Sequence, residues 1–133
     1  QLIGIFESIN EDMEKAKNQS KIKYYKNLFK SCIIGINKLN WDREEYFVEA
    51  LSQLTTIQID LLGYLFTKGE NFTGSISYGG VPQELTDGSL NMLSDLGLLD
   101  KTIGSIVLGD IGKQNMGYKV SSLGREFISY TFA

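Results

Sequence analysis

The residue types that most often perform catalysis are scarce in this chain of 133 residues. It contains no histidine, so both the commonest general base and the commonest zinc ligand are missing. Its one cysteine, Cys32, lies in the apolar stretch FKSCIIGI, and we expect a small buried residue there, because no histidine is present to activate the thiol. Serines and threonines are plentiful, but no neighbouring histidine or lysine pattern nominates one of them as a nucleophile. The sequence therefore predicts a protein that is not an enzyme, with no catalytic residue and no cofactor.

Two further patterns could be mistaken for ligand sites. Glu44, Glu45 and Glu49 are clustered, and the last two are one helical turn apart. A hard cation would need more oxygen ligands, and nothing in the sequence supplies them, so we expect an exposed acidic helix face and no metal site. The glycine-containing segment 69–80 lacks the spacing of a P-loop or of a dinucleotide-binding loop, which favours a strand with a loose connection.

A lysine-rich stretch is the clearest electrostatic feature of the sequence. Lys23, Lys26 and Lys30 recur at spacings of three and four, which places them along one face of a helix. Such a face predicts contact with nucleic acid, an anionic membrane surface or an acidic partner. The alternatives are a solvated face, or pairing within the chain with the acidic cluster at 42–49. With one neighbouring lysine and two from the predicted hairpin, the candidate contact residues are Lys21, Lys23, Lys26, Lys30, Lys113 and Lys119.

Composition limits the class of protein. Apolar residues make up 42% of the chain and aromatic residues 11%, which is enough to bury a core, so general disorder is excluded. No apolar run approaches the length needed to span a membrane, and a single cysteine allows no internal disulfide. The net charge of −3 excludes a polycation. These features favour a reducing, cytoplasmic location, and Gln1 in place of an initiator methionine indicates a processed chain or a fragment.

The first half of the chain predicts helices that would carry the lysines and the acidic cluster. Apolar residues at spacings of three and four predict helices over 2–18 and 20–38, and a third helix that starts after Asn40 or Asp42. A fourth helix is expected to end at Gly69. The expected inner residues are Ile22, Tyr25, Phe29, Ile33 and Ile36 of the second helix, Phe47, Leu51 and Leu54 of the third, and Ile57, Leu61, Leu62, Leu65 and Phe66 of the fourth.

The first predicted helix carries a dense apolar set close to the chain end, where unpacked segments usually fray. The set predicts self-association as a homodimer through this helix, because a partner that covered it would remove a substantial apolar area from water. Its residues are Leu2, Ile5, Phe6 and Ile9.

The second half of the chain predicts both strands and helices. Alternating residues indicate the strands, and proline, glycine and hydroxyl residues indicate the ends of the helices. The expected elements are a strand over Asn71–Tyr78, a short helix over Pro82–Leu85, a helix over Thr86–Leu96 capped by Thr86 and ended by Gly97, hairpin strands at 105–111 and 117–121 with the turn inside 112–116, and a last helix capped by Ser121 or Ser122.

From Thr55 onward, this order of elements resembles that of a winged-helix domain of the kind found in many small bacterial regulators. The segment LNMLSDLGLLDK (90–101) resembles the end of the helix that follows the turn in such domains. The segment GYKVSSLGREF (117–127) resembles the second wing strand running into the closing helix. The resemblance covers about 75 to 80 residues and implies a winged-helix fold, which hosts both DNA-binding proteins and protein-interaction modules.

The charge of the helix that would read DNA opposes that use. In a winged helix this helix enters the major groove, and lysine or arginine side chains contact the phosphates. Here the corresponding segment 86–96 contains Asp87 and Asp95 and no lysine or arginine, and Glu84 precedes it. These carboxylates would repel phosphate, so the sequence favours a protein partner for this helix.

The segment WDREEYFVEALSQLTTIQIDLLGYL (41–65) is similar to the helical part of bacterial and phage proteins of the Abi-alpha abortive-infection type. That resemblance implies a phage-defence or phage-encoded context and no known catalytic residues. We expect a mainly α fold with a small β-hairpin (α+β), in which an N-terminal helical layer at 1–50 packs on a winged-helix-like domain at 51–133. The expected function is that of a binding or regulatory module, acting through protein–protein interaction or self-association. The alternative is a winged-helix DNA-binding transcriptional regulator.

Overall fold

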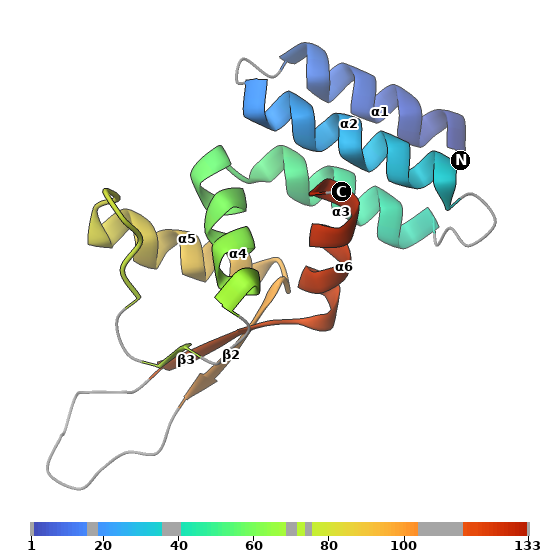
Figure 1. Cartoon of the computed structure of the whole chain (residues 1–133). Coiled ribbons are helices and arrows are strands. Elements are labelled where there is room, and N and C mark those ends of the chain that lie inside the picture. Colours follow the sequence, from blue (N-terminus) through green and yellow to red (C-terminus); the bar gives the residue numbers. More distant parts are fainter. Residues whose placement is uncertain are drawn as a thin grey trace, which may run out of the picture. The chain divides into compact units, whose positions relative to one another are not determined.

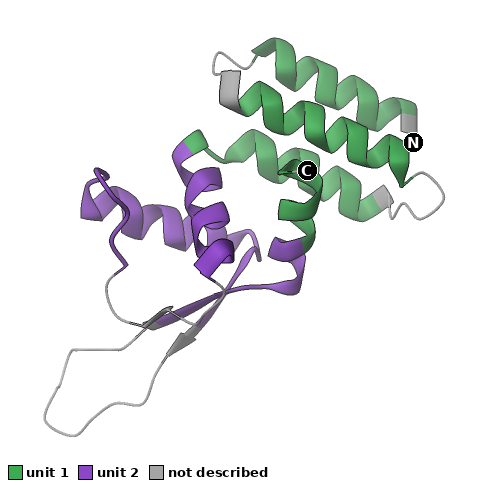
Figure 2. Cartoon of the chain, viewed as in Figure 1, with its two compact units in different colours: residues 1–56, 126–133 green, residues 57–125 purple. Residues whose placement is uncertain are grey.

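The computed structural model describes residues 2–15, 19–35, 41–68, 72–73, 76–103 and 116–132. Over these residues the chain is mainly helical with a small antiparallel sheet (Figure 1), so the predicted mainly α fold with a β-hairpin is confirmed. Within these ranges, no helix combines the length and the apolar character needed to cross a membrane. The chain divides into two compact units, unit 1 with residues 1–56 and 126–133 and unit 2 with residues 57–125 (Figure 2). The expected division into a helical layer at 1–50 and a winged-helix-like domain at 51–133 stays a prediction.

Unit 1 is a bundle of helices. Helix α1 (Leu2–Lys15) and helix α2 (Gln19–Ile34) lie side by side, and both pack against helix α3 (Trp41–Gln53). The last part of helix α6 (Ser122–Thr131) adds Phe127, whose ring meets Phe47 edge to face with 5.5 Å between the centroids. The core consists of apolar side chains that recur at helical spacing, among them Ile5, Ile9, Tyr25, Leu28, Phe47, Leu51 and Phe127.

The helices predicted for unit 1 are confirmed over the residues that the structure describes. The expected inner stripe of α3, which consists of Phe47, Leu51 and Leu54, is fully buried. In α2, however, the prediction that Ile33 faces inward is wrong, because its side chain is 48% exposed. The buried stripe of that helix runs through Tyr25, Leu28 and Cys32, and Ile33 lies one position further around the helix.

Unit 2 combines helix α4 (Thr56–Lys68), of which Thr56 belongs to unit 1, and helix α5 (Gln83–Asp95) with a small sheet. The strands are β1 (Phe72–Thr73), β2 (Leu99–Ile103) and β3 (Met116–Val120), in the order β1-β3-β2 with antiparallel neighbours. Its core is formed by Ile59, Leu61, Leu62 and Leu65 of α4, Leu90 and Leu93 of α5, and Tyr118 and Val120 of β3. Ile57 and Phe66, which were expected inside, are 39% and 42% exposed.

The hairpin of unit 2 uses a different strand from the one predicted. Strand β3 pairs with β2, in a register that places Leu99 opposite Val120. The prediction that 105–111 supplies the partner strand is wrong, because the neighbours of β3 are β1 and β2. Residues 105–111 themselves lie outside the described residues. The charged residues Asp100 and Lys101 stand in the middle of β2 and hide the alternation that marks a strand.

Helix α5 is one helix where two, at Pro82–Leu85 and Thr86–Leu96, were predicted. The backbone N–H groups of Leu85 and Thr86 donate to the carbonyl of Pro82 at 3.1 and 3.0 Å, so the helix continues without a break. Thr86 is therefore not a cap; it is buried, and its hydroxyl donates to the same carbonyl at 3.3 Å. The predicted strand over 71–78 is also too long, since β1 has two residues and 76–78 form no strand.

The start of α6 is held by the predicted serine cap. The backbone N–H of Gly124 donates to Ser121 Oγ at 2.9 Å, which confirms Ser121 as the capping residue. The Ser121 hydroxyl in turn donates to the carbonyl of Gly97 at 2.6 Å. Gly97 has a φ of 78°, the left-handed conformation expected for a glycine that ends a helix. The cap thus fixes the first turn of α6 to the turn between α5 and β2.

Candidate functional site

Unit 1 contains a groove between α1 and α3 with a volume of about 690 Å³. On α3, Asp42, Glu45 and Glu49 recur at spacings of three and four and so share one face of the helix. On α1, Glu11 and Asp12 add two more carboxylates. We call this surface the acidic groove. Beside its carboxylates it is lined by the small, apolar and hydroxyl residues Gly4, Ile5, Ser8, Tyr46, Val48 and Ser52.

The acidic groove offers negative charge without forming a metal site. Among the residues that the structure describes, no group of three or more Asp, Glu or Cys side chains is placed to hold a metal ion. Four of the five carboxylates, those of Glu11, Asp42, Glu45 and Glu49, are exposed to water. Such an arrangement suits a ligand that carries several spaced cationic groups and some apolar surface, which describes a lysine-bearing helix.

A smaller cavity of about 270 Å³ is lined by Lys21 and shares Asp12 and Ser52 with the acidic groove. The Nζ atom of Lys21 donates to the carbonyl of Ser52 at 3.2 Å. The hydroxyl of Tyr25 donates to Asp12 at 3.3 Å. Burial lowers the pKa of Lys21, and the nearby Asp12 carboxylate acts in the opposite direction. Lys21 is thus tied into the bundle, unlike the lysines that follow it.

The other lysines of α2 form an exposed row. Lys23, Lys26 and Lys30 are all exposed. Within the described part of the chain, none of them lies within ion-pair distance of a carboxylate, so the pairing with the 42–49 cluster that the sequence left open is not formed there. Ile33 and Ile34, which are 48% and 78% exposed, extend the same side of the helix. We call these five residues the basic face of α2.

The remaining candidate lysines belong to the other unit. Lys119 lies on β3, is exposed, and stands opposite Asp100 in the register of β2 and β3. Lys113 lies outside the described residues. Of the six candidate lysines, the structure thus brings Lys23, Lys26 and Lys30 together on one exposed face of α2.

The apolar set expected to drive self-association is largely used inside unit 1. Ile5 and Ile9 are 2% and 0% exposed. Phe6 is half-buried and packs on Phe29, with 4.4 Å between the ring centroids. The side chain of Leu2 lies outside the described residues. The premise that these side chains need a partner to cover them is thus wrong for Ile5 and Ile9, because their own bundle covers them.

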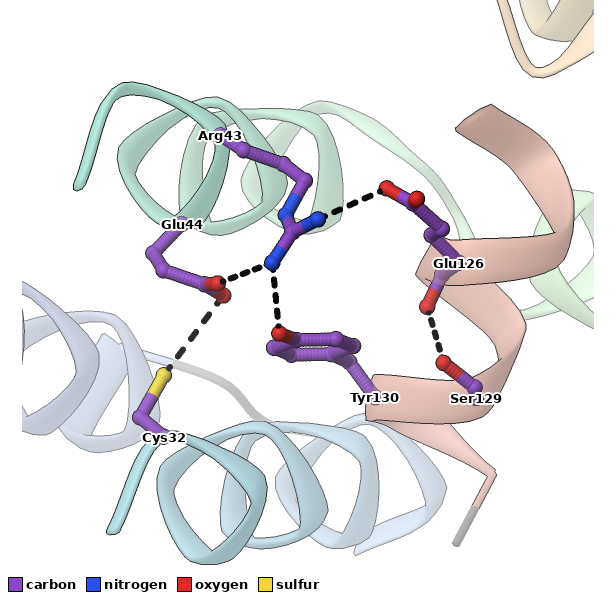
Figure 3. Close-up of polar contacts among 6 residues, drawn as sticks. All are labelled: Cys32, Arg43, Glu44, Glu126, Ser129 and Tyr130. Carbon is purple, nitrogen blue, oxygen red and sulfur yellow. Dashed lines mark hydrogen bonds and ion pairs between the residues drawn. The ribbon is translucent and has the colours of Figure 1, made fainter. Parts of the chain in front are cut away.

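A buried polar network joins α2, α3 and α6 within unit 1 (Figure 3). Its centre is Glu44, which is 0% exposed, so the expectation that it lies on an exposed acidic face is wrong. Arg43 donates to Glu44 at 3.2 Å, to Glu126 at 3.1 Å and to the Tyr130 hydroxyl at 2.9 Å. The thiol of Cys32 donates to the second oxygen of Glu44 at 3.8 Å.

The sequence contained a signal for this burial. Glu44 precedes Phe47 by three residues and Leu51 by seven, so it continues the inner stripe of α3. The prediction of an exposed side chain followed the residue type and not this position, because a glutamate is rarely buried without a partner. The partner that makes burial tolerable, Arg43, is adjacent in the chain but gains its other contacts from Glu126 and Tyr130 of α6.

The network keeps Cys32 from acting as a nucleophile. The thiol is fully buried, as the sequence predicted, and burial together with the Glu44 carboxylate raises its pKa from 9.0 to about 12. The thiolate is the reactive form, and its fraction at pH 8 is then about a thousandfold lower than for a thiol of ordinary pKa. This chemistry favours a structural role for the cysteine.

We expect Cys32 of the native protein to resist alkylation by iodoacetamide at about pH 8, where an ordinary exposed thiol reacts readily. The rate should rise about tenfold per pH unit from this low value without levelling off below the raised pKa, because the thiolate fraction rises in that proportion while the protonated thiol dominates. Mass spectrometry of the labelled protein over time measures the rate, and the same protein in denaturant provides the fully reactive reference. Labelling of the native protein as fast as that of the denatured protein would contradict the buried, protonated state.

Unit 1 thus presents two surfaces of opposite charge, the acidic groove and the basic face of α2, and has a buried network that holds its helices together. Both surfaces are suited to binding a charged helix or peptide. Comparison of the chain with protein-family models, with curated proteins and with solved structures found no significant match.

Proposed function

We propose that this protein is a non-enzymatic binding module whose unit 1 receives a basic, partly apolar helix of a protein partner. The observation that carries the proposal is the acidic groove, which places five carboxylates around one cavity between α1 and α3. Lysine side chains of a bound helix would lie among these carboxylates, and its apolar residues would meet Tyr46 and Val48 on the groove wall. This is the helix-in-groove mode of recognition, with electrostatic steering added.

Several features support a protein over a nucleic acid as the partner of this groove. Phosphate carries the same sign of charge as the groove carboxylates, so a nucleic acid would be repelled from it. The net charge of the chain, −3, does not favour a polyanion either. A non-enzymatic role is supported by the absence of histidine from the sequence and by the protonated state of the Cys32 thiol.

We further propose that unit 2 is winged-helix-like. The support is its element order from α4 to β3, together with a central β3 flanked by β1 and β2. The order differs from the predicted one in that α5 is a single helix, without the turn that was expected between two helices. DNA binding is the second candidate function, and this order of elements is the observation that favours it. Against it, α5 exposes Glu84, Asp87 and Asp95, which would face phosphate if this helix entered the major groove. The phage-defence context remains an expectation from the sequence resemblance.

A synthetic helical peptide with lysines and leucines at spacings of three and four tests the proposed function. We expect it to bind and to shift the backbone amide NMR signals of Glu11, Glu45 and Glu49, because its charge and shape fit the groove. The Glu45→Lys/Glu49→Lys variant should bind about tenfold more weakly or worse, since two attractive contacts become repulsive.

The matched control is Glu7→Lys/Glu14→Lys, which changes the net charge equally at exposed positions outside the groove lining. This variant should bind the peptide nearly as well as the unmodified chain, apart from the general effect of net charge. A short DNA duplex at low salt provides the competing outcome. Duplex binding together with no peptide binding would refute the proposed function and favour the DNA-binding alternative.

A further inference from the structure

We propose that the helix received by the acidic groove is α2 of a second copy of this chain, presented through its basic face. This inference rests on the proposed function and names its partner. It concerns Lys23, Lys26, Lys30, Ile33 and Ile34 of one copy, and the carboxylates and apolar wall of the groove in the next.

The two charged rows have matching spacing. The lysines of the basic face recur at spacings of three and four residues, and so do the groove carboxylates Asp42, Glu45 and Glu49 on α3. Each row therefore rises by about 10 Å along its helix, because seven residues advance a helix at 1.5 Å each. Two helices that lie alongside each other could pair all three positions without stretching either row.

The basic face of α2 cannot fill the acidic groove of the same chain. The residues of α2 that face the bundle are Tyr25, Leu28 and Cys32, which are buried among the helices of unit 1. The basic face is on the exposed side of α2, and the described residues place no carboxylate within ion-pair distance of its three lysines. The groove lies between α1 and α3, so a basic face that fills it belongs to another molecule.

The basic face has apolar surface as well as charge. Ile33 and Ile34 are 48% and 78% exposed and follow the lysine row directly. Exposed ion pairs alone contribute little to affinity, and burial of these isoleucines against a second molecule adds the apolar contribution that such pairs lack. We therefore expect weak self-association that weakens further as salt is added.

The contact is heterologous, because the two surfaces that meet are different parts of unit 1. Each copy then has one groove and one basic face to offer. Such contacts form rings if the rotation between copies closes, and open chains if it does not, so assembly should not stop at a dimer unless the geometry closes there. An isologous dimer through α1, by contrast, would stop at two copies.

Two variants that each lose one surface test this directly. The face variant is Lys23→Gln/Lys26→Gln/Lys30→Gln, and the groove variant is Asp42→Asn/Glu45→Gln/Glu49→Gln. We expect sedimentation velocity to show concentration-dependent assembly of the unmodified chain in about 50 mM salt. That assembly should weaken at about 500 mM, where the Debye length is about threefold shorter. Each variant alone should associate at least about tenfold more weakly than the unmodified chain.

The decisive sample is the mixture of the two variants. The face variant keeps its groove and the groove variant keeps its basic face, so the mixture should form a 1:1 complex and nothing larger. The control Glu7→Gln/Glu14→Gln changes exposed carboxylates outside the groove and should assemble like the unmodified chain. The single changes Lys26→Gln and Glu45→Gln repeat the mixing test with minimal disturbance, should a triple variant fail to fold.

The outcomes separate this inference from the proposed function. A chain that stays monomeric up to about 1 mM, while the lysine–leucine peptide still binds the groove, would overturn self-recognition and leave the proposed function standing. Closed dimers formed by each variant alone would also overturn it, because only an isologous contact elsewhere explains them. Loss of both peptide binding and self-association would overturn both proposals.

Discussion

Gly124→Ala should lower the free energy of unfolding by about 3 kcal/mol, and by more if the backbone cannot adjust. A Cβ atom at this position would collide with the carbonyl oxygen of Leu98 and lie 3.0 Å from a methyl carbon of Val120. The carbonyl cannot easily move away, because it accepts a hydrogen bond from the Ser121 N–H at 3.1 Å. The side chain of Ser121 is itself fixed by Gly97 and by the Gly124 N–H.

Urea denaturation followed by circular dichroism measures this effect, with Gly88→Ala as the matched control. Gly88 is exposed on α5, and a Cβ there would meet nothing within 4 Å. The control should stabilise the protein by up to about 1 kcal/mol, because alanine favours a helix more than glycine does. If Gly124→Ala remained within about 1 kcal/mol of the unmodified chain, the close approach of α6 to the carbonyl of Leu98 would be wrong.

Arg43→Ala should destabilise the protein by about 3 kcal/mol, because it leaves the buried Glu44 carboxylate without its guanidinium partner. Removing one member of a buried ion pair costs more stability than removing both, because the remaining charge stays buried without a partner. The double variant Arg43→Ala/Glu44→Gln should therefore recover part of the stability that Arg43→Ala loses. Thermal and urea denaturation of both variants measure the difference. A double variant no more stable than Arg43→Ala alone would show that the cost lies in the other contacts of Arg43.

Glu126→Ala provides the comparison for an exposed partner of the same arginine. Glu126 accepts from Arg43 at 3.1 Å, but its side chain is 47% exposed. Water screens such a pair, so this change should cost less than about 1 kcal/mol. A cost as large as that of Arg43→Ala would mean that the exposed pair with Glu126, and not the buried pair with Glu44, accounts for the effect of removing Arg43.

The helices could be predicted from the sequence because their signal is local. Phe47, Leu51 and Leu54 follow one another at helical spacing, and their burial is confirmed. The presence of a hairpin could be predicted, but not which segment pairs with β3, since strand pairing depends on residues far apart in the chain. Asp100 and Lys101 interrupt the apolar alternation of β2, and the pairing with β3 becomes visible only in the register.

The candidate site shows the same division between local and distant information. The row formed by Lys23, Lys26 and Lys30 was predicted from spacing alone, because all three residues lie on one helix. The acidic groove was not, because Glu11 and Asp12 of α1 reach the carboxylates of α3 only through packing. Glu44 falls between the two cases. The sequence spacing places it on the inner stripe of α3, but the contacts of its partner Arg43 with α6 could not be predicted from the sequence.

The way the chain is divided between the units has a consequence for its synthesis. Unit 2 is one continuous stretch, 57–125, whereas unit 1 needs residues from both sides of that stretch. On the ribosome, domains generally fold in the order in which they emerge. Here Phe127 and Tyr130, whose rings pack on Phe47, emerge after all of unit 2. The unit that is translated first is therefore completed last, and its nascent helices keep apolar surface open to chaperones until α6 arrives.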